Sequence, residues 1–385
     1  MMQNFSFHNP CQIEFGEGQI AKLATLIPAD ARVLLLYGGG SIKHNGVYDE
    51  VASALSQHHW QAFAGVEPNP EFETLMRAVK FAREQRLDFV LAVGGGSVID
   101  GAKFVAAAIP HDGDCWLIIG NRVPLKTALP IGVVLTLPAT GSESNFAAVI
   151  SRRETNDKLS FKNPLVFPKF AVLDPKTTMT LPARQIGNGV VDAFVHTTEQ
   201  YLTYPNGALL QDRLAEGILQ TLIEIGPITL AEPNDYNARA NLMWAANQAL
   251  FGLVGLGQPQ DWATHAMGHE LTMLHGLDHA QTLAIILPSL WRYRFAAKQA
   301  KLAQYGRRVW QLNGDDKVVA QEAIAKTEDF FQRMGLHTSL SAYQLDATIV
   351  ADGVAEQLTR HNRLRLGEHL DLTPDDCRAI LLTAS

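Results

Sequence analysis

The sequence predicts an α/β first half built on a parallel sheet, followed by an all-α second half. Short apolar runs alternate with helical stretches up to about residue 182, and long helical patterns replace them afterwards. The chain has 385 residues, which is more than the roughly 250–300 at which one hydrophobic core usually stops growing. We therefore expect two domains, residues 1–182 and 183–385.

The apolar runs of the first half are short and uninterrupted, which is typical of parallel strands covered on both faces. They are Arg32–Tyr37, Asp88–Val93, Ile131–Leu137 and Phe170–Leu173. Helical stretches such as Leu75–Gln85 and Ala102–Ala108 lie between them.

The second half shows helical periodicity and few strand patterns, so we expect an all-α domain that begins after a hinge at Leu181-Pro182. The expected helices are Gly189–Tyr201, Gln211–Ile225, Tyr236–Leu250, Gln260–Leu274, Gln281–Arg294, Ala300–Leu312 and Val318–Met334.

Composition excludes several classes of protein. The net charge is -7 and we find no Lys/Arg-rich run, so nucleic acid is not an expected partner. Cys11, Cys115 and Cys377 are far apart and form no CxxC motif, which argues against disulfides and a cysteine zinc site and fits the cytoplasm. No apolar run approaches the length of a membrane span and the first residues do not resemble a signal peptide, so no membrane contact is expected.

Two Gly-Gly-Gly-Ser turns follow expected strands, at residues 38–41 and 94–97. The second opens a helix, where close backbone approach and free N–H groups can bind a pyrophosphate. A tight turn that binds nothing is the alternative. The first turn lacks the carboxylate that favours NAD over NADP, so the sequence predicts NADP(H). Lys43 would offset a 2′-phosphate charge, or is simply a solvated lysine.

A third loop, at residues 136–145, is rich in hydroxyl and amide side chains and follows a strand. Such loops bind ligands at the carboxyl edge of open α/β sheets, although this composition is also typical of an ordinary polar turn.

Asp192 and His196 share one face of an otherwise apolar helix. A carboxylate is costly there unless a metal ion, a helix end or an ion pair holds it. Four of the 13 histidines follow close together: His265, His269, His275 and His279. Imidazole is the commonest transition-metal ligand, so we expect a divalent zinc or iron ion. Spacing alone does not say which of these later histidines bind it.

These motifs resemble the iron-containing (group III) alcohol dehydrogenases, and in particular their NADPH-dependent aldehyde reductase and butanol dehydrogenase branch. The resemblance rests on GGGSVID at 94–100, TLPATGSESN at 136–145, NGVVDAFVH at 188–196 and QDWATHAMGHELTMLHGLDHAQ at 260–281. It covers essentially the whole chain. It implies a Rossmann-like first domain, a helical second domain and a site in the cleft between them.

The resemblance also implies roles for individual residues. It assigns one divalent ion to Asp192, His196, His265 and His279, and it places His269 beside the ion as a catalytic residue that is not a ligand. Relatives that use NAD carry an aspartate in place of Gly39. The positions that would line the cofactor are Gly39, Gly40, Ser41, Gly95, Gly96, Ser97, Asp100, Thr136, Thr140, Asn145 and Lys158.

The expected function is therefore metal-dependent, NADP(H)-linked interconversion of small aldehydes and primary alcohols, in a homodimer like the relatives. One alternative is a metal- and NAD-dependent lyase of the dehydroquinate synthase type. That site needs lysines and arginines, and segments 188–200 and 260–281 contain none. A relative that binds metal and nucleotide without catalysis is the other alternative.

Overall fold

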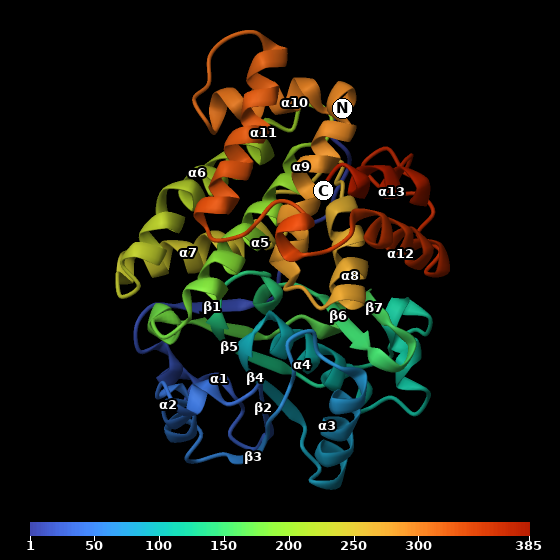
Figure 1. The fold of residues 1–385 in the computed structure, drawn as a ribbon. Coiled ribbons are helices and arrows are strands. Elements are labelled where there is room, and N and C mark those ends of the chain that lie inside the picture. The colour runs from blue at the N-terminus through green and yellow to red at the C-terminus, as the bar shows by residue number, and fades with distance from the viewer. The chain divides into compact units, whose positions relative to one another are not determined.

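The computed structural model describes residues 1–385, which form two compact units (Figure 1). The sheet unit comprises His8–Leu181 and Pro233–Met243, and the helical unit comprises Met1–Phe7, Pro182–Glu232 and Trp244–Ser385. Helix α7 begins in the first and ends in the second. The division into domains 1–182 and 183–385 stays a prediction.

A six-stranded parallel sheet in the order β1-β8-β5-β4-β2-β3 forms the centre of the sheet unit. Its four inner strands are those that the sequence predicts, because they are largely buried and consist almost entirely of apolar residues and glycine. β1 and β3 escape prediction because they are short, half-exposed edge strands. The strands are β1 (Gln12–Phe15), β2 (Arg32–Tyr37), β3 (His59–Phe63), β4 (Phe89–Gly95), β5 (Ile131–Leu137) and β8 (Phe170–Leu173).

Helices cover both faces of this sheet, as the buried runs predict. Successive strand residues point to opposite faces. Val33 and Leu35 of β2 belong to one buried core with residues of α1 and α2, whereas Leu34 and Leu36 belong to a second core with α3 and α4. The helices are α1 (Leu23–Leu26), α2 (Val47–Ala54), α3 (Phe72–Glu84) and α4 (Gly96–Ala108).

The strand order places a topological switch at the two glycine turns. β2 and β4 are neighbours in the sheet, but the connection after β2 leads to β3 on one side and the connection after β4 leads to β5 on the other. In doubly wound sheets ligands bind outside the carboxyl ends of the strands at such a point. The turn Gly38–Gly40 follows β2, and Gly94–Gly96 forms the junction at which β4 ends and α4 begins, so both glycine segments lie at this switch.

An antiparallel pair, β6 (Ala147–Arg152) and β7 (Asp157–Lys162), was not predicted from the sequence. The pair packs against α4 and carries Lys158, whose Nζ donates a hydrogen bond to Asn69 at 2.8 Å.

The helical unit contains only helices and turns apart from one isolated bridge, so the predicted all-α half is confirmed. Every helix expected there is present, and α12 and α13 are additional. The bounds are α5 (Ala183–Tyr201), α6 (Leu209–Ala231), α7 (Tyr236–Ala249), α8 (Ala263–His275), α9 (His279–Tyr293), α10 (Phe295–Arg308), α11 (Asp316–Arg333), α12 (Ala347–Arg360) and α13 (Pro374–Leu382).

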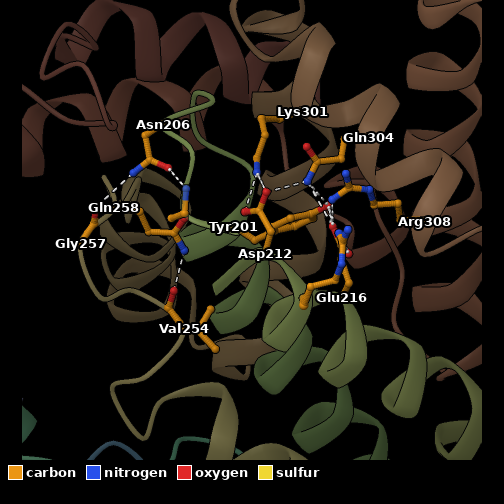
Figure 2. A network of polar contacts seen from close by, with 12 residues as sticks. Tyr201, Asn206, Asp212, Glu216, Val254, Gly257, Gln258, Lys301, Gln304 and Arg308 are labelled. Carbon is orange, nitrogen blue, oxygen red and sulfur yellow. Dashed lines mark hydrogen bonds and ion pairs between the residues drawn. The ribbon is translucent and has the colours of Figure 1, made fainter. Parts of the chain in front are cut away.

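By length and composition, α6 is the one helix that is apolar enough to cross a membrane, which the sequence reading overlooked. Core helices of soluble proteins pass the same test. α6 packs on α5 and carries two buried carboxylates, Asp212 and Glu216. Both belong to a polar network in which Lys301 binds Asp212 through both oxygens at 2.8 Å (Figure 2).

Candidate metal centre and nucleotide-binding turns

One face of α5 carries the first half of the candidate metal centre. Asp192, His196 and Glu199 follow one another at spacings of four and three residues, so their side chains share one face. All three are buried, and Asp192 is only 4% exposed. The remainder of the helix is largely apolar, so packing against the neighbouring helices fixes this polar face in place.

α8 and α9 supply the histidines. His265 and His269 lie one turn apart in α8, which ends at His275 because Gly276 adopts a left-handed conformation with φ 71°. α9 begins at His279 after the N-cap residue Asp278. Gly276 therefore separates His275 from the helix that begins at His279.

The predicted ligands converge around Asp192. His196 Nδ1 lies 3.5 Å from Asp192 Oδ1, and the Nε2 atoms of His265 and His279 each lie 3.9 Å from that oxygen. The imidazole rings of His196 and His265 stack with centroids 4.5 Å apart. Ligand atoms about 2.1 Å from one ion lie within about 4 Å of each other, and those of Asp192, His265 and His279 lie within 4.8 Å of one another. His196 does not belong to this group of three, so its place among the ligands stays a prediction.

The surroundings of the donor atoms favour a positive charge. Asp192 Oδ1 and His265 Nε2 are buried without a hydrogen-bond partner, which is costly unless a cation satisfies them. Burial would raise the pKa of Asp192, but His196 and the other two histidines hold it well below its ordinary value. Burial would lower the pKa of His265, but Glu199 and Asp192 raise it to about 9. The centre therefore attracts positive charge, as a cation site should.

A second connection fixes the start of α9. Asn188 of α5 donates from Nδ2 to Asp278 at 2.7 Å, and the backbone N–H of Asp278 donates to Gln281 at 2.9 Å. His279 is the residue after Asp278, so this contact positions the last predicted ligand relative to α5.

His269 lies beside the predicted ligands. Its ring centroid is 5.1 Å from that of His279 and 6.2 Å from that of His265. Trp262 also contacts this group, because its ring centroid lies 5.4 Å from that of His265. The backbone of Trp262 is left-handed with φ 60°. This conformation is uncommon for a bulky residue, and such backbone strain is often found at functional sites.

In the sheet unit, the turn after β4 is closely packed. A Cβ added to Gly96 would lie 2.5 Å from Thr140 Oγ1, and one added to Gly95 would lie 3.0 Å from Leu137. Gly96 is the first residue of α4, so its backbone N–H is among those left free at the helix N-terminus. Ser97 Oγ accepts a hydrogen bond from the backbone of Asn69 at 3.2 Å.

The turn after β2 is open by contrast. A Cβ on Gly39 would meet nothing within 4 Å, whereas Gly40 requires glycine because its φ is 99°. Ser41 is exposed and begins a short 3₁₀ turn. Lys43 Nζ lies 5.4 Å and 5.1 Å from the ring centroids of Tyr37 and Tyr48, so these rings hold it near the turn.

Lys103, which was not predicted as a site residue from the sequence, stabilises the loop after β5 through hydrogen bonds. Its buried Nζ donates to Ser142 Oγ at 2.8 Å and to Asn145 Oδ1 at 3.0 Å, and burial lowers its pKa to about 8. Asp100 accepts from Ser142 Oγ at 2.5 Å and from the backbone of Val149 at 2.8 Å. Asp100 and Asn145 therefore shape this loop, and their predicted contact with the cofactor stays a prediction.

Three further residues complete the description of the two sites. Thr136 is buried near the end of β5, at the same edge of the sheet as the glycine turns. Thr177 is buried and donates from Oγ1 to the carbonyl of Leu135 at 2.7 Å. Glu199 was not singled out, although its place seven residues after Asp192 puts it on the ligand-bearing face.

Both units match models of one protein family. Residues 10–175 match the family model described as iron-containing alcohol dehydrogenase, and residues 187–384 match the model of the C-terminal part of that family. The chain is 56% identical over 384 residues to the NADPH-dependent aldehyde reductase YqhD of Escherichia coli (strain K12), covering 98% of this chain and 99% of that protein.

More distant relatives differ in the cofactor that they are named for. The chain is 41% identical to NADH-dependent butanol dehydrogenase A of Clostridium acetobutylicum, covering 88% of this chain and 89% of that protein. It is 40% identical to NADP-dependent alcohol dehydrogenase 3 of Entamoeba histolytica, covering 89% and 90%. Among solved structures, that of E. coli YqhD superimposes with a TM-score of 0.98 at 55% identity, covering 100% of this chain and 99% of that one.

Proposed function

The chain belongs to the iron-containing alcohol dehydrogenase family, and from that premise we propose that it interconverts small aldehydes and primary alcohols with NADP(H) and one divalent metal ion. The observation that carries this proposal is the convergence of Asp192, His265 and His279, whose ligand atoms lie within 4.8 Å of one another. His196 contributes from the same helix face as Asp192.

The protein's residues would share the work as follows. Asp192, His196, His265 and His279 hold the ion, which when bound supplies a Lewis acid for the substrate's carbonyl oxygen. NADPH supplies the hydride for the carbonyl carbon. We propose that His269, whose ring centroid lies 5.1 Å from that of His279, holds or delivers the proton that the alcohol oxygen needs.

The glycine turns would hold the cofactor through backbone rather than charge. The turn after β4 presents the free N–H groups of α4 to the pyrophosphate. The turn after β2 carries no carboxylate that would repel a 2′-phosphate, and Lys43 adds a positive charge nearby. Choice of NADP(H) over NAD(H) is therefore proposed to depend on Gly39 and its neighbours.

The test is oxidation of NADPH by the purified chain with butanal as substrate, followed at the absorbance of the reduced nicotinamide. We expect turnover that disappears when a chelator removes the metal and returns when zinc or iron is added. A chain that binds metal and NADPH but turns over no short aldehyde would contradict the proposal and favour a non-catalytic relative.

We also propose that the chain is a cytoplasmic homodimer, as the family resemblance implies. The three cysteines are buried and unpaired, which a reducing compartment allows. Light scattering coupled to size-exclusion chromatography tests the dimer, because a mass of one 42.2 kDa chain would contradict it.

A further inference from the structure

Both oxygens of the Glu199 carboxylate contact His265 or the preceding residue, Thr264. Oε1 accepts from the backbone N–H of Thr264 at 2.8 Å and of His265 at 3.4 Å, and Oε2 is paired with Nδ1 of the His265 ring. The side chain is 2% exposed, so water does not compete for these contacts. One carboxylate therefore fixes both the backbone and the ring of His265.

These contacts decide which ring nitrogen of His265 faces the metal centre. A neutral imidazole carries one N–H donor and one lone pair, and an ionised carboxylate only accepts. The proton therefore belongs on Nδ1, and the lone pair on Nε2. Nε2 is buried without a hydrogen-bond partner and lies 3.9 Å from Asp192 Oδ1. The lone pair consequently points toward the other predicted ligands.

We propose that Glu199 is a positioning residue that holds His265 in the Nε2-ligating tautomer and thereby sets the affinity of the centre for its divalent ion. The inference rests on the proposed metal site. Glu199 itself is not counted as a ligand, because its oxygens are committed to Thr264 and His265. Carboxylates that orient a ligating histidine in this way typically contribute 10–100-fold, in order of magnitude, to metal affinity.

A glutamine at position 199 has the same shape but only one acceptor oxygen. If that oxygen stays with the backbone N–H groups of Thr264 and His265, the amide NH₂ faces Nδ1. The ring proton then moves to Nε2 and occupies the lone pair that the metal needs. If the amide flips, its NH₂ meets the backbone N–H donors in a buried place, which is unfavourable. Either arrangement weakens metal binding.

The helical unit offers a matched control in Glu216. This carboxylate is also buried, but it accepts from Tyr201 Oη at 2.9 Å and from Arg308 Nη1 at 2.8 Å (Figure 2). Neither partner is a predicted metal ligand. Glu216→Gln therefore removes a buried carboxylate from the same unit without altering the orientation of His265.

The experiment strips the full-length chain of metal and titrates it with Zn²⁺ against a chromogenic chelator. Glu199→Gln should weaken Zn²⁺ binding by about 10–100-fold, whereas Glu216→Gln should lower the melting temperature but leave affinity within about twofold. In a His265→Ala background, Glu199→Gln should have no further effect, because the histidine that it orients is gone.

Unchanged Zn²⁺ affinity in Glu199→Gln would overturn the inference, and so would an equal loss with and without His265. Failure of the unaltered chain to bind Zn²⁺, Fe²⁺ or Co²⁺ would instead overturn the proposed metal site. If Glu199→Gln does not fold, ¹⁵N-histidine NMR of the unaltered metal-bound chain tests the inference directly. The His265 ring, assigned by its loss in His265→Ala, should carry its proton on Nδ1, and a proton on Nε2 would overturn the inference.

Discussion

The two units build their candidate sites from opposite materials. In the helical unit, α5, α8 and α9 bring the potential ligand atoms of Asp192, His265 and His279 within 4.8 Å of one another. In the sheet unit, the turns after β2 and β4 contribute backbone N–H groups and space, with glycine chosen for the absence of a side chain. A substitution should therefore act through lost chemistry in the first unit and through lost space or added charge in the second.

The glycines are not equivalent within the sheet unit. A Cβ added to Gly96 would lie 2.5 Å from Thr140 Oγ1, Gly40 needs its left-handed backbone, and a Cβ added to Gly39 would meet nothing within 4 Å. The three glycines therefore differ in their tolerance for a side chain. Packing excludes a side chain at Gly96, backbone strain disfavours one at Gly40, and Gly39 has room for one.

The largest effect should follow removal of a predicted ligand. His265→Ala and His279→Ala should each lose the metal ion and at least about 10³-fold in kcat/KM, because stabilisation of the developing alkoxide is lost. Metal content per chain and NADPH oxidation with butanal measure the two effects. Full metal occupancy in both variants would show that the ligands are other residues.

His269→Ala should separate catalysis from metal binding. Its ring lies beside His279, but the proposed role is proton delivery, so we expect full metal content and a kcat reduced by about 10²-fold. If His269→Ala loses metal as completely as His265→Ala, His269 belongs to the ligand set. The comparison uses metal analysis and steady-state kinetics on the same preparations.

Residue spacing within a single helix was enough to predict part of the candidate metal centre from the sequence. Asp192 and His196 are neighbours on one helix, so their spacing of four residues was sufficient. The choice among the later histidines depends on where α8 ends and α9 begins, which Gly276 and Asp278 determine only once the helices pack. Sequence spacing also contained Glu199, but its role became visible only through its contacts with His265.

The sheet unit was predictable where burial makes strands uniformly apolar. β2, β4, β5 and β8 are of this kind, whereas the edge strands β1 and β3 and the pair β6 and β7 mix polar and apolar residues. The first glycine motif marked a turn correctly, whereas in the second Gly94 and Gly95 end β4 and Gly96 begins α4 without a separate turn. Their different tolerance for a side chain depends on Thr140 and Leu137, which come from another loop and another strand.

Gly96→Ala should reduce stability and NADPH binding to an intermediate extent, and Gly39→Ala is the matched control. The new methyl group would overlap Thr140, and overpacking of this kind typically costs about 1–3 kcal/mol. We expect a lower melting temperature and weaker NADPH binding by fluorescence titration, with metal content unchanged. Gly39→Ala, which meets nothing within 4 Å, should leave both quantities near those of the unaltered chain. Equal effects of the two substitutions would contradict the difference in packing.

The smallest predicted effect concerns the choice between two cofactors, and it tests the open position directly. In the unaltered chain, kcat/KM for NADPH should exceed that for NADH by at least about tenfold, or roughly 1.4 kcal/mol. Gly39→Asp should narrow or reverse this ratio, mainly by raising KM for NADPH, because its carboxylate would repel the 2′-phosphate. The side chain has room at this position, so a general loss of folding should not obscure the result.

The neutral variant Gly39→Asn separates charge from size in this prediction. It fills nearly the same space as aspartate but brings no negative charge, so it should keep most of the preference for NADPH. The effect of Gly39→Asp should also shrink in high salt, because Coulomb repulsion between exposed groups is screened over about 10 Å at 0.1 M ionic strength. Equal efficiency with both cofactors in the unaltered chain would mean that the open turn only permits NADPH. An equal change in Gly39→Asn and Gly39→Asp would assign the effect to size, and the argument from repulsion would fail.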